Sequence, residues 1–256
     1  MRDALKRVLS EEQRRWLRST AKGNPYRFER GEDRVRIGDA VSPLRYDVMI
    51  RVRHFALHAE RRELYASDFD AYERMVRAEP YFVWFKRARV PTWWPWLLDD
   101  PDAFEEAWRD RLRKSAELFE SFTANGFDPA YPIELHAGRT VREMPTGKRL
   151  ARTIYSGDGN HRLALLLAAG HEFLAPAEYR VKRYRWLVPT DSTGFLLRET
   201  GAGWSEYCPF IELGYPSARL SMSGGRVRIE AADPATQAEV SALVEHDLPY
   251  LAGPPE

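Results

Sequence analysis

The sequence predicts a soluble globular protein of the α+β class. Its composition, with 44% hydrophobic and 30% charged residues, is typical of a chain that buries a core. A length of 256 residues is enough for one domain, or one domain with a sizeable extension. Stretches with helical periodicity and stretches with strand-like alternation both occur along the chain, so we expect helices and strands in the same fold.

Charge and cysteine content narrow the class further. The 39 basic and 38 acidic side chains leave a net charge of +1, so the overall charge demands neither nucleic acid nor an anionic membrane. The single Cys208 excludes an intrachain disulfide framework and a cysteine-based zinc cluster, and it fits a reducing cytoplasm. No apolar run follows the charged N-terminus, and no stretch is long enough to span a bilayer. We therefore expect a cytoplasmic protein without a membrane partner.

The N-terminal part of the chain carries weak signals. A loose apolar stripe among charges predicts a helix over 3–21, whose simplest role is to cover the domain's own core. Glycines, prolines and polar residues predict loops over 22–47, with a short strand at 34–37. Partial alternation of apolar and polar residues predicts a strand over 48–57.

Aromatic residues dominate the next segments. We expect a helix over 68–78, and the run 81–85 fits either a strand or a buried helix. Residues 91–98 contain three tryptophans and two prolines, which excludes a long regular element. These rings would be functional if they stacked on a sugar or a base. A loop that fills the core is the more common arrangement for a tryptophan cluster, and we expect it here.

The clearest helical signal covers 102–124. Apolar residues recur there at helical spacing, acidic residues gather near the start, and Asn125-Gly126 is a natural stop. Strand signals follow at 131–136, 150–156 and 177–184, the first two joined by a turn or hairpin over 137–149. The tail beyond residue 185 is mixed, with a turn at 189–194, a strand at 226–230 and one clear helix from Asp233.

The most informative segment joins a strand end to a short apolar helix that stops at Gly170. Two glycines in the joining turn allow a sharp bend and a close approach to a ligand. The amides that open the next helix have no partner within it, and the helix dipole adds positive potential, so such a turn binds phosphate well. The turn carries an acid, an amide, an imidazole and a guanidinium, in the order Gly157, Asp158, Gly159, Asn160, His161, Arg162.

An ordinary structural role explains the same residues about as well. Asp158-Gly159 is a common turn pair and Asn160 is a common helix N-cap, which would leave His161 and Arg162 in solvent. Two cations in a first helical turn nevertheless oppose the helix dipole. A mismatch of this kind is expected where a site requires it.

The order of these segments resembles that of the ParB/sulfiredoxin superfamily. In that family a helix of the type Glu-x-x-x-Ser-x-x-x-x-Gly leads into a Pro-Ile strand, and a phosphate-binding box opens the next helix. The corresponding residues here are Glu117 to Gly126, then Pro132-Ile133, then Asp158 to Arg162. The resemblance covers about residues 102–184.

The resemblance implies a ParB/sulfiredoxin-like core, a small mixed sheet with helices, over 101–185. An N-terminal extension of helices and strands would occupy 1–100, and a C-terminal appendage over 186–256 would pack on the core. Oligomeric state is not readable from these patterns.

Members of this superfamily differ in the box, and so does their chemistry. Sulfiredoxin has a cysteine before the His-Arg pair, where this chain has Asn160, which speaks against sulfur chemistry of that kind. ParB partition proteins have a Glu-Arg-Arg type of box, bind CTP and continue into a helix-turn-helix region. The box of the ParB-like free serine kinases, Asp-Gly-His-His-Arg, is the most similar and differs only at Asn160.

The resemblance therefore implies a kinase-type phosphotransferase that uses ATP or ADP, with CTP as another candidate nucleotide, and Mg²⁺. Its acceptor would be a small hydroxyl-bearing metabolite such as an amino acid or a sugar. Asp158 would hold Mg²⁺ or accept the acceptor's proton, and His161 would act at the transferring group. The residues expected to contact nucleotide phosphates are Gly157, Gly159, Asn160, His161 and Arg162.

The family has a separate catalytic acid at the start of the preceding helix. Asp102, Glu105 and Glu106 lie there, and Glu105 is our candidate, although each is equally a solvated carboxylate of a helix start. Ser121 and Asn125 are candidates to line the same cleft, and capping or packing explains them as well.

Two other functions stay open on the same core. One is a nucleotide-gated regulatory or DNA-binding protein of the ParB type, against which the near-zero net charge and the lack of a helix-turn-helix pattern speak. The other is a nuclease or nucleotide hydrolase, in which water replaces the hydroxyl acceptor. A zinc site is disfavoured: His54 and His58 are four residues apart and would share a face on a helix, but a strand is predicted in this region, and no third ligand accompanies them.

Overall fold

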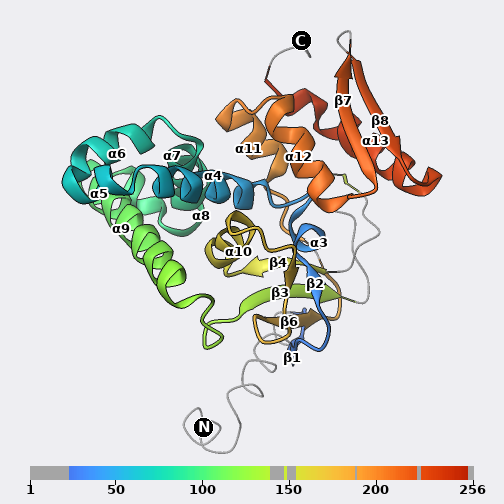
Figure 1. Cartoon of the computed structure of the whole chain (residues 1–256), viewed down its shortest axis with the longest axis horizontal. Coiled ribbons are helices and arrows are strands. Elements are labelled where there is room, and N and C mark those ends of the chain that lie inside the picture. The colour runs from blue at the N-terminus through green and yellow to red at the C-terminus, as the bar shows by residue number, and fades with distance from the viewer. Residues whose placement is uncertain (1–22, 139–146, 149–153, 188, 224–225, 253–256) are drawn as a thin grey trace, which may run out of the picture.

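The computed structural model describes residues 23–138, 147–148, 154–187, 189–223 and 226–252. Helices and strands combine in one fold, which confirms the α+β prediction (Figure 1). The predicted helix over 3–21, most of the turn or hairpin over 137–149 and the first part of the strand over 150–156 lie outside the described residues. None of the helices in the described segments has the length and apolar character needed to cross a membrane.

A four-stranded mixed sheet lies at one end of the molecule (Figure 1). Its strands are β1 (Tyr26–Arg30), β3 (Ile133–Gly138), β4 (Ile154–Asp158) and β6 (Tyr179–Tyr184), in the order β1-β6-β3-β4. The central strands β3 and β6 are parallel, and each outer strand is antiparallel to its neighbour. The segment expected to be an N-terminal extension therefore supplies an edge strand of the sheet.

Helix α10 (Asn160–Ala168) follows β4 and packs against helix α4 (Tyr46–Glu60). Its leucines are buried in the main hydrophobic core, and Gly170, with a φ of +82°, lies just beyond its end as predicted. The core therefore runs continuously from the sheet through α10 into the helices of the N-terminal half.

The predicted strand over 48–57 is wrong, because this segment lies within α4. The helix buries polar residues as well as apolar ones on its inner face. These buried polar residues are Asp47, Arg51, His54 and His58. Their spacing is helical, but the hydrophobic pattern alone hides it, since the core side of this helix is not uniformly apolar.

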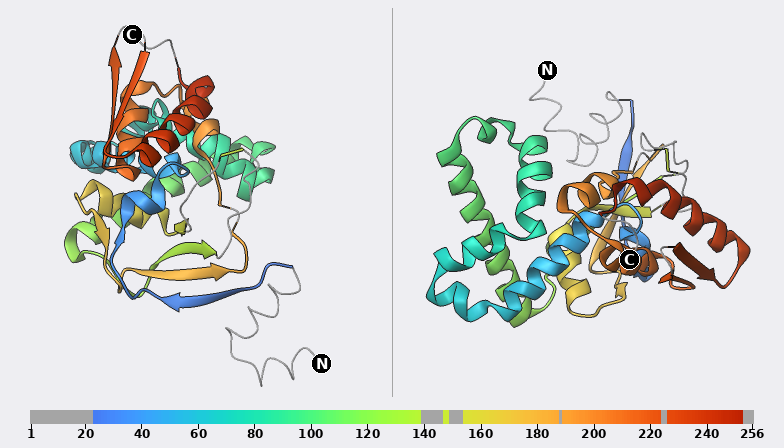
Figure 2. Two further views of the ribbon diagram at one scale, coloured as in Figure 1. Left: turned by 90° about the vertical axis from the view of Figure 1, so that its right-hand side faces the viewer. Right: turned by 90° about the horizontal axis from the view of Figure 1, so that it is seen from above.

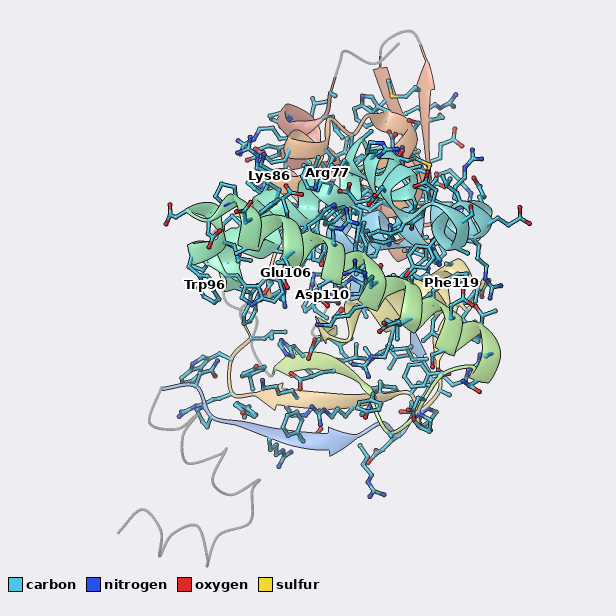
Figure 3. All side chains as sticks on the ribbon, turned by 90° about the vertical axis from the view of Figure 1, so that its left-hand side faces the viewer. Arg77, Lys86, Trp96, Glu106, Asp110 and Phe119 are labelled. Carbon is cyan, nitrogen blue, oxygen red and sulfur yellow. The ribbon has the colours of Figure 1, made fainter. Side chains whose placement is uncertain are left out.

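Helices α4 to α9 form a layer on one side of the molecule (Figure 2). Its other elements are α5 (Arg62–Ser67), α6 (Phe69–Arg77), α7 (Pro80–Trp84), a π-helical turn (Phe85–Arg89), α8 (Val90–Trp93), a 3-10 turn (Pro95–Leu98) and α9 (Pro101–Asn125). The helices predicted over 68–78 and 102–124 are confirmed, and the run 81–85 takes the helical alternative. Figure 3 shows α9 crossing the face of this layer.

The tryptophan segment only partly fills the core. Trp94 packs on the core with its ring centre 6.4 Å from that of Phe85. Trp93 and Trp96 are both 61% exposed, so the prediction of a core-filling loop is wrong for these two rings. The structure thus leaves two large aromatic side chains on the surface, one on each side of Pro95.

The described part of the tail contains three α-helices and a 3-10 turn (Leu248–Tyr250), where the sequence showed one clear helix. The α-helices are α11 (Thr193–Thr200), α12 (Trp204–Gly214) and α13 (Pro234–Asp247), with the hairpin β7 (Ala218–Ser223) and β8 (Arg226–Ala231) before α13. The strand at 226–230 and the last helix are confirmed. Helix α12 was missed because Pro209 lies inside it, although its buried residues recur at helical spacing.

Two short elements join the tail to the sheet. The strand predicted at 34–37 is the two-residue β2 (Val35–Arg36), which pairs with β5 (Phe173–Leu174). Helix α3 (Ile37–Val41) follows β2 and packs against α12 and β4. The C-terminal elements lie on one side of α10, and helices α5 to α9 lie on the other side (Figure 2).

Candidate functional site

The glycine-hinged turn connects β4 to α10. Gly159 is the N-cap of the helix and has a φ of +81°, a left-handed conformation that glycine adopts without strain. The Oδ1 atom of Asp158 accepts a hydrogen bond from the Gly159 N–H at 2.7 Å, while the Asp158 side chain stays exposed. A Cβ atom at Gly159 would lie 3.2 Å from the Cα atom of Ile133, so the turn also packs closely on β3.

Asn160 is the first residue of α10 and not its N-cap, which corrects the sequence-based expectation. Its side chain braces the turn instead: Oδ1 accepts from the Ser156 hydroxyl, and Nδ2 donates to the Gly157 carbonyl at 3.4 Å. The actual N-cap is a glycine, which has no side chain to cap the first amides of the helix. These amides are therefore available to an anion.

Arg162 connects the turn to the segment before β3. Its guanidinium donates a hydrogen bond to the backbone carbonyl of Tyr131. Burial lowers the pKa of Arg162, and Arg180 lowers it further, while the carboxylate of Asp158 acts in the opposite direction. An arginine nevertheless remains protonated in a protein, so Arg162 keeps a positive charge beside the turn.

His161 is a neutral imidazole rather than a solvated cation. The Tyr81 hydroxyl lies 3.0 Å from its Nε2 atom, and the Nη2 atom of Arg111 lies 2.9 Å from its Nδ1 atom. Loss of contact with water lowers the pKa of His161 well below its ordinary value, and the guanidinium groups of Arg111 and Arg51 lower it further. Because arginine can only donate, the ring must offer an acceptor to Arg111.

A cleft with a volume of ≈ 280 Å³ opens at the turn. Its lining residues are Arg51, Trp84, Arg89, Arg111, Lys114, Ser115, Leu118, Asp158, Gly159, Asn160, His161 and Arg162. Five of these side chains are cationic, and Asp158 is the single carboxylate among them. We call this space the cationic cleft. Its charge, together with the amides of α10, favours a ligand that carries several negative charges.

Four of the five cations were not among the site residues predicted from the sequence. Arg51 lies on α4, Arg89 ends the π-helical turn, and Arg111 and Lys114 lie on α9. The π-helical turn precedes Pro91, which has no N–H for the α-helical hydrogen-bond ladder. Basic residues on a helix usually form a solvated face, so only the folded chain identifies these four as parts of one site.

Two further hollows adjoin the cationic cleft. The apolar hollow, of ≈ 330 Å³, is lined by Leu118, Ser121, Phe122, Gly126, Phe127, Asp128, Tyr131 and Arg162. The mixed hollow, of ≈ 340 Å³, is lined by Arg45, Asp47, Arg51, Trp84, Ala88, Arg89, Thr92, Trp93, Gly157, Asp158, Asn160, Thr190, Ser192 and Leu196. Each hollow shares lining residues with the cationic cleft, so the three spaces adjoin along the turn, and we refer to them together as the groove.

The site residues predicted from the sequence fall in three places. The six residues of the turn, from Gly157 to Arg162, all line the groove. Ser121 lines the apolar hollow, whereas Asn125 is the exposed last residue of α9 and is not among the residues lining these three spaces. Glu105 forms an ion pair with Arg77 on α6 and likewise lines none of the three.

Metal ligands are sparse at this site. In the segments that the structure describes, no three His, Cys, Asp or Glu side chains gather as a protein-held metal ion would need. Asp158 alone offers a carboxylate to the cationic cleft. One carboxylate is enough for a Mg²⁺ ion that a nucleotide's phosphates also hold, because Mg²⁺ commonly combines one or two carboxylates with phosphate oxygens and water.

Comparison with known proteins adds no relative. No family model, curated protein or solved structure matches the chain.

Proposed function

We propose that this protein is a nucleotide-dependent phosphotransferase, built on a ParB/sulfiredoxin-like core, that acts on a small hydroxyl-bearing metabolite. The observation that carries the proposal is the composition of the cationic cleft. Five cationic side chains line it beside a single carboxylate, Asp158. Arg51 already pairs with Asp47, and Lys114 with Asp110. The cleft therefore offers a ligand Arg89, Arg111 and Arg162, together with the amides at the start of α10. Phosphoryl transfer depends mainly on positioning and on neutralising charge, which is what such a set of groups supplies.

The phosphates of ATP, ADP or CTP fit this cleft by charge. Arg111 has no ion pair with any residue that the structure describes, so a ligand would be its counterion. Arg162 adds a guanidinium at the helix start, where it can bind phosphate oxygens in a bidentate manner. The amides of α10 and the helix dipole act on the same ligand.

Asp158 is the residue to which we assign the proton transfer. The acceptor's hydroxyl oxygen would form a bond to the terminal phosphorus, and its proton would pass to the Asp158 carboxylate. The bond from that phosphorus to the bridging oxygen would break, and the leaving nucleotide would keep the electron pair. In the alternative role, Asp158 would instead hold a Mg²⁺ ion that accompanies the nucleotide, and the ion would neutralise phosphate charge.

His161 would act through its contact with Arg111. A neutral imidazole that accepts from Arg111 holds this guanidinium in the cleft without adding a sixth positive charge. Glu105 has no part in this mechanism, because its carboxylate is engaged by Arg77.

Calorimetry with ATP, ADP and CTP in the presence of Mg²⁺ tests nucleotide binding. Mass spectrometry of the same mixtures, with amino acids and sugars added, tests transfer. We expect Asp158→Asn to keep nucleotide affinity and to lower turnover by about 10²- to 10⁴-fold, the usual contribution of a general base. We expect Arg162→Ala to weaken binding, with Arg228→Ala, an exposed arginine of the distant hairpin, as the matched control.

Absence of both nucleotide binding and turnover in the wild-type protein would refute the proposal. Release of free phosphate without a phosphorylated product would instead identify a hydrolase, in which water takes the place of the acceptor. Retention of duplex DNA in a salt-sensitive gel shift would favour the ParB-type alternative.

A further inference from the structure

The mixed hollow lies directly beside the cationic cleft. The two spaces share five lining residues, which are Arg51, Trp84, Arg89, Asp158 and Asn160. Asp158 therefore stands at the boundary, with the cations of the cleft on one side and the mixed hollow on the other. A ligand group in the mixed hollow and a phosphate in the cationic cleft would both lie beside the Asp158 carboxylate.

Two of the three arginines of the mixed hollow already share a carboxylate, that of Asp47. Asp47 is buried and receives hydrogen bonds from Arg45 Nε at 2.8 Å and from Arg51 Nη1 at 2.6 Å. Burial opposes ionisation of Asp47, but the two guanidinium groups outweigh it and lower the pKa of the carboxyl strongly. Arg45 also donates to the carbonyl of Ser156, which fixes it under the turn. These hydrogen bonds hold both guanidinium groups in the wall of the hollow, whereas Arg89 has no such partner in the part of the chain that the structure describes.

Arg89 is the cation that remains for a ligand. Among the described residues it forms no ion pair, and its guanidinium lies over the rings of Trp93 and Trp94, with 5.1 Å and 4.6 Å to the ring centres. Burial lowers the pKa of Arg89, and Arg111 lowers it further, as expected for a cation that lacks a counterion. One negatively charged ligand group in the mixed hollow would be the counterion of Arg89.

Trp93 gives the mixed hollow an open aromatic surface. The ring is 61% exposed although it lines the hollow, so a ligand can cover it. Hydroxyl-bearing side chains, Thr92, Thr190 and Ser192, complete the lining. An indole face beside hydroxyl groups and a carboxylate suits a sugar ring, whose C–H face packs on the aromatic surface while its hydroxyls form hydrogen bonds.

We propose that the mixed hollow is the acceptor subsite and takes a sugar-like polyhydroxy compound with one anionic group. This inference rests on the proposed phosphotransferase function. The anionic group pairs with Arg89, the ring covers Trp93, and one hydroxyl meets Asp158 at the boundary with the cationic cleft. That hydroxyl's proton passes to Asp158 as its oxygen bonds to the terminal phosphorus of the nucleotide, and the nucleoside diphosphate leaves.

A matched pair of tryptophans provides the test. Trp93 and Trp96 are equally exposed, but only Trp93 lines the mixed hollow, and Trp96 lines none of the three spaces (Figure 3 labels Trp96). Binding of glucuronate, glucose 6-phosphate and glucose is measured by NMR titration of each variant, and ATP binding by calorimetry. Thermal unfolding confirms that both variants remain folded.

We expect Trp93→Ala to weaken glucuronate or glucose 6-phosphate binding at least tenfold and to change the Kd for ATP less than twofold. Trp96→Ala should change neither value. Arg89→Gln should weaken binding of the anionic sugars tenfold or more and that of glucose much less. The two anionic probes show whether the carboxylate or the phosphate monoester is preferred.

The subsite is refuted if Trp93→Ala and Trp96→Ala have equal effects, or if the wild-type protein binds none of the probes. In either case, ATP binding by the wild-type protein would leave the proposed function standing. Loss specific to Trp93→Ala in a protein that binds no nucleotide would support the subsite and refute the phosphotransferase.

Discussion

His161 shows how a residue's surroundings decide its chemistry. The sequence placed it beside Arg162 in a first helical turn, where an imidazolium would bind phosphate. The structure sets it against Tyr81 and Arg111, and burial with nearby guanidinium groups keeps the ring neutral. Because burial and these charges set the pKa of His161, we expect its protonation to depend on whether a ligand occupies the cationic cleft.

A bound polyphosphate should raise the pKa of His161, because its negative charge offsets the guanidinium groups that lower it. Without ligand the pKa of His161 lies well below its ordinary value of 6.5, so the ring is neutral near pH 7. If binding raises this pKa, the complex should take up a proton as the pH falls toward the pKa of the bound state. Affinity for ATP should then rise on acidification, by at most about tenfold per pH unit for one proton.

Calorimetry in buffers of different ionisation enthalpy between pH 5 and 7 measures this proton uptake. The variant His161→Gln serves as the control for protonation of the nucleotide itself. The same pH dependence in wild type and His161→Gln would show that the imidazole takes no proton on binding.

The start of α10 is the element on which the site depends. Gly159 and Gly170 flank this helix with nearly the same left-handed φ, +81° and +82°. They differ in surroundings: a Cβ atom on Gly159 would meet the backbone of Ile133 at 3.2 Å, whereas one on Gly170 would have nothing within 4 Å. Comparing an alanine substitution at each position therefore distinguishes the cost of backbone strain, which both share, from the cost of close packing, which only Gly159 has.

Gly170→Ala should lower the free energy of unfolding by about 1 kcal/mol, the cost of a left-handed alanine. Gly159→Ala should cost about 2–3 kcal/mol, because a steric conflict with β3 adds to the same strain. Urea unfolding measures both values. Equal losses would mean that β3 yields to the added methyl group without cost.

Helices and strands were predictable from the sequence where the core side of the element is apolar. Helix α9 and the strands β3, β6 and β8 show this, since their residues follow the expected period. The prediction failed for α4, whose buried face carries Arg51 and His54, and for α12, where Pro209 interrupts the pattern. In both elements tertiary contacts stabilise a helix that local propensity does not favour.

At the scale of the whole molecule, a buried ion cluster ties distant segments together. The Lys148 ammonium lies 2.8 Å from Asp247 Oδ1 at the end of α13 and 3.4 Å from Asp191 Oδ2 before α11. All three side chains are almost fully buried, and Tyr207 donates to Asp247 at 3.0 Å. The C-terminal elements are therefore fastened to the rest of the chain by a charge that has no access to water.

Lys148→Met should lower the free energy of unfolding by about 3–5 kcal/mol, because it removes the buried ammonium that lies between the carboxylates of Asp191 and Asp247. The double variant Lys148→Met with Asp247→Asn should recover part of this loss. Arg228→Met, which removes an exposed partner of Glu230, should change stability by less than about 1 kcal/mol. Denaturant unfolding gives all three values, and a small loss for Lys148→Met would show that water or neutralised carboxylates compensate for the lysine.

The sequence by itself determined the α+β class and the glycine-hinged turn from Gly157 to Arg162, for which we propose a phosphate ligand. Both depend on local chemistry: apolar periodicity for the elements, and glycine hinges beside charged residues for the turn. Only the tertiary structure decided which side chains from other elements line the cleft at that turn. Arg51, Arg89, Arg111 and Lys114 come from separate helices, and a cation on a helix surface is identical in sequence whether it faces water or a ligand.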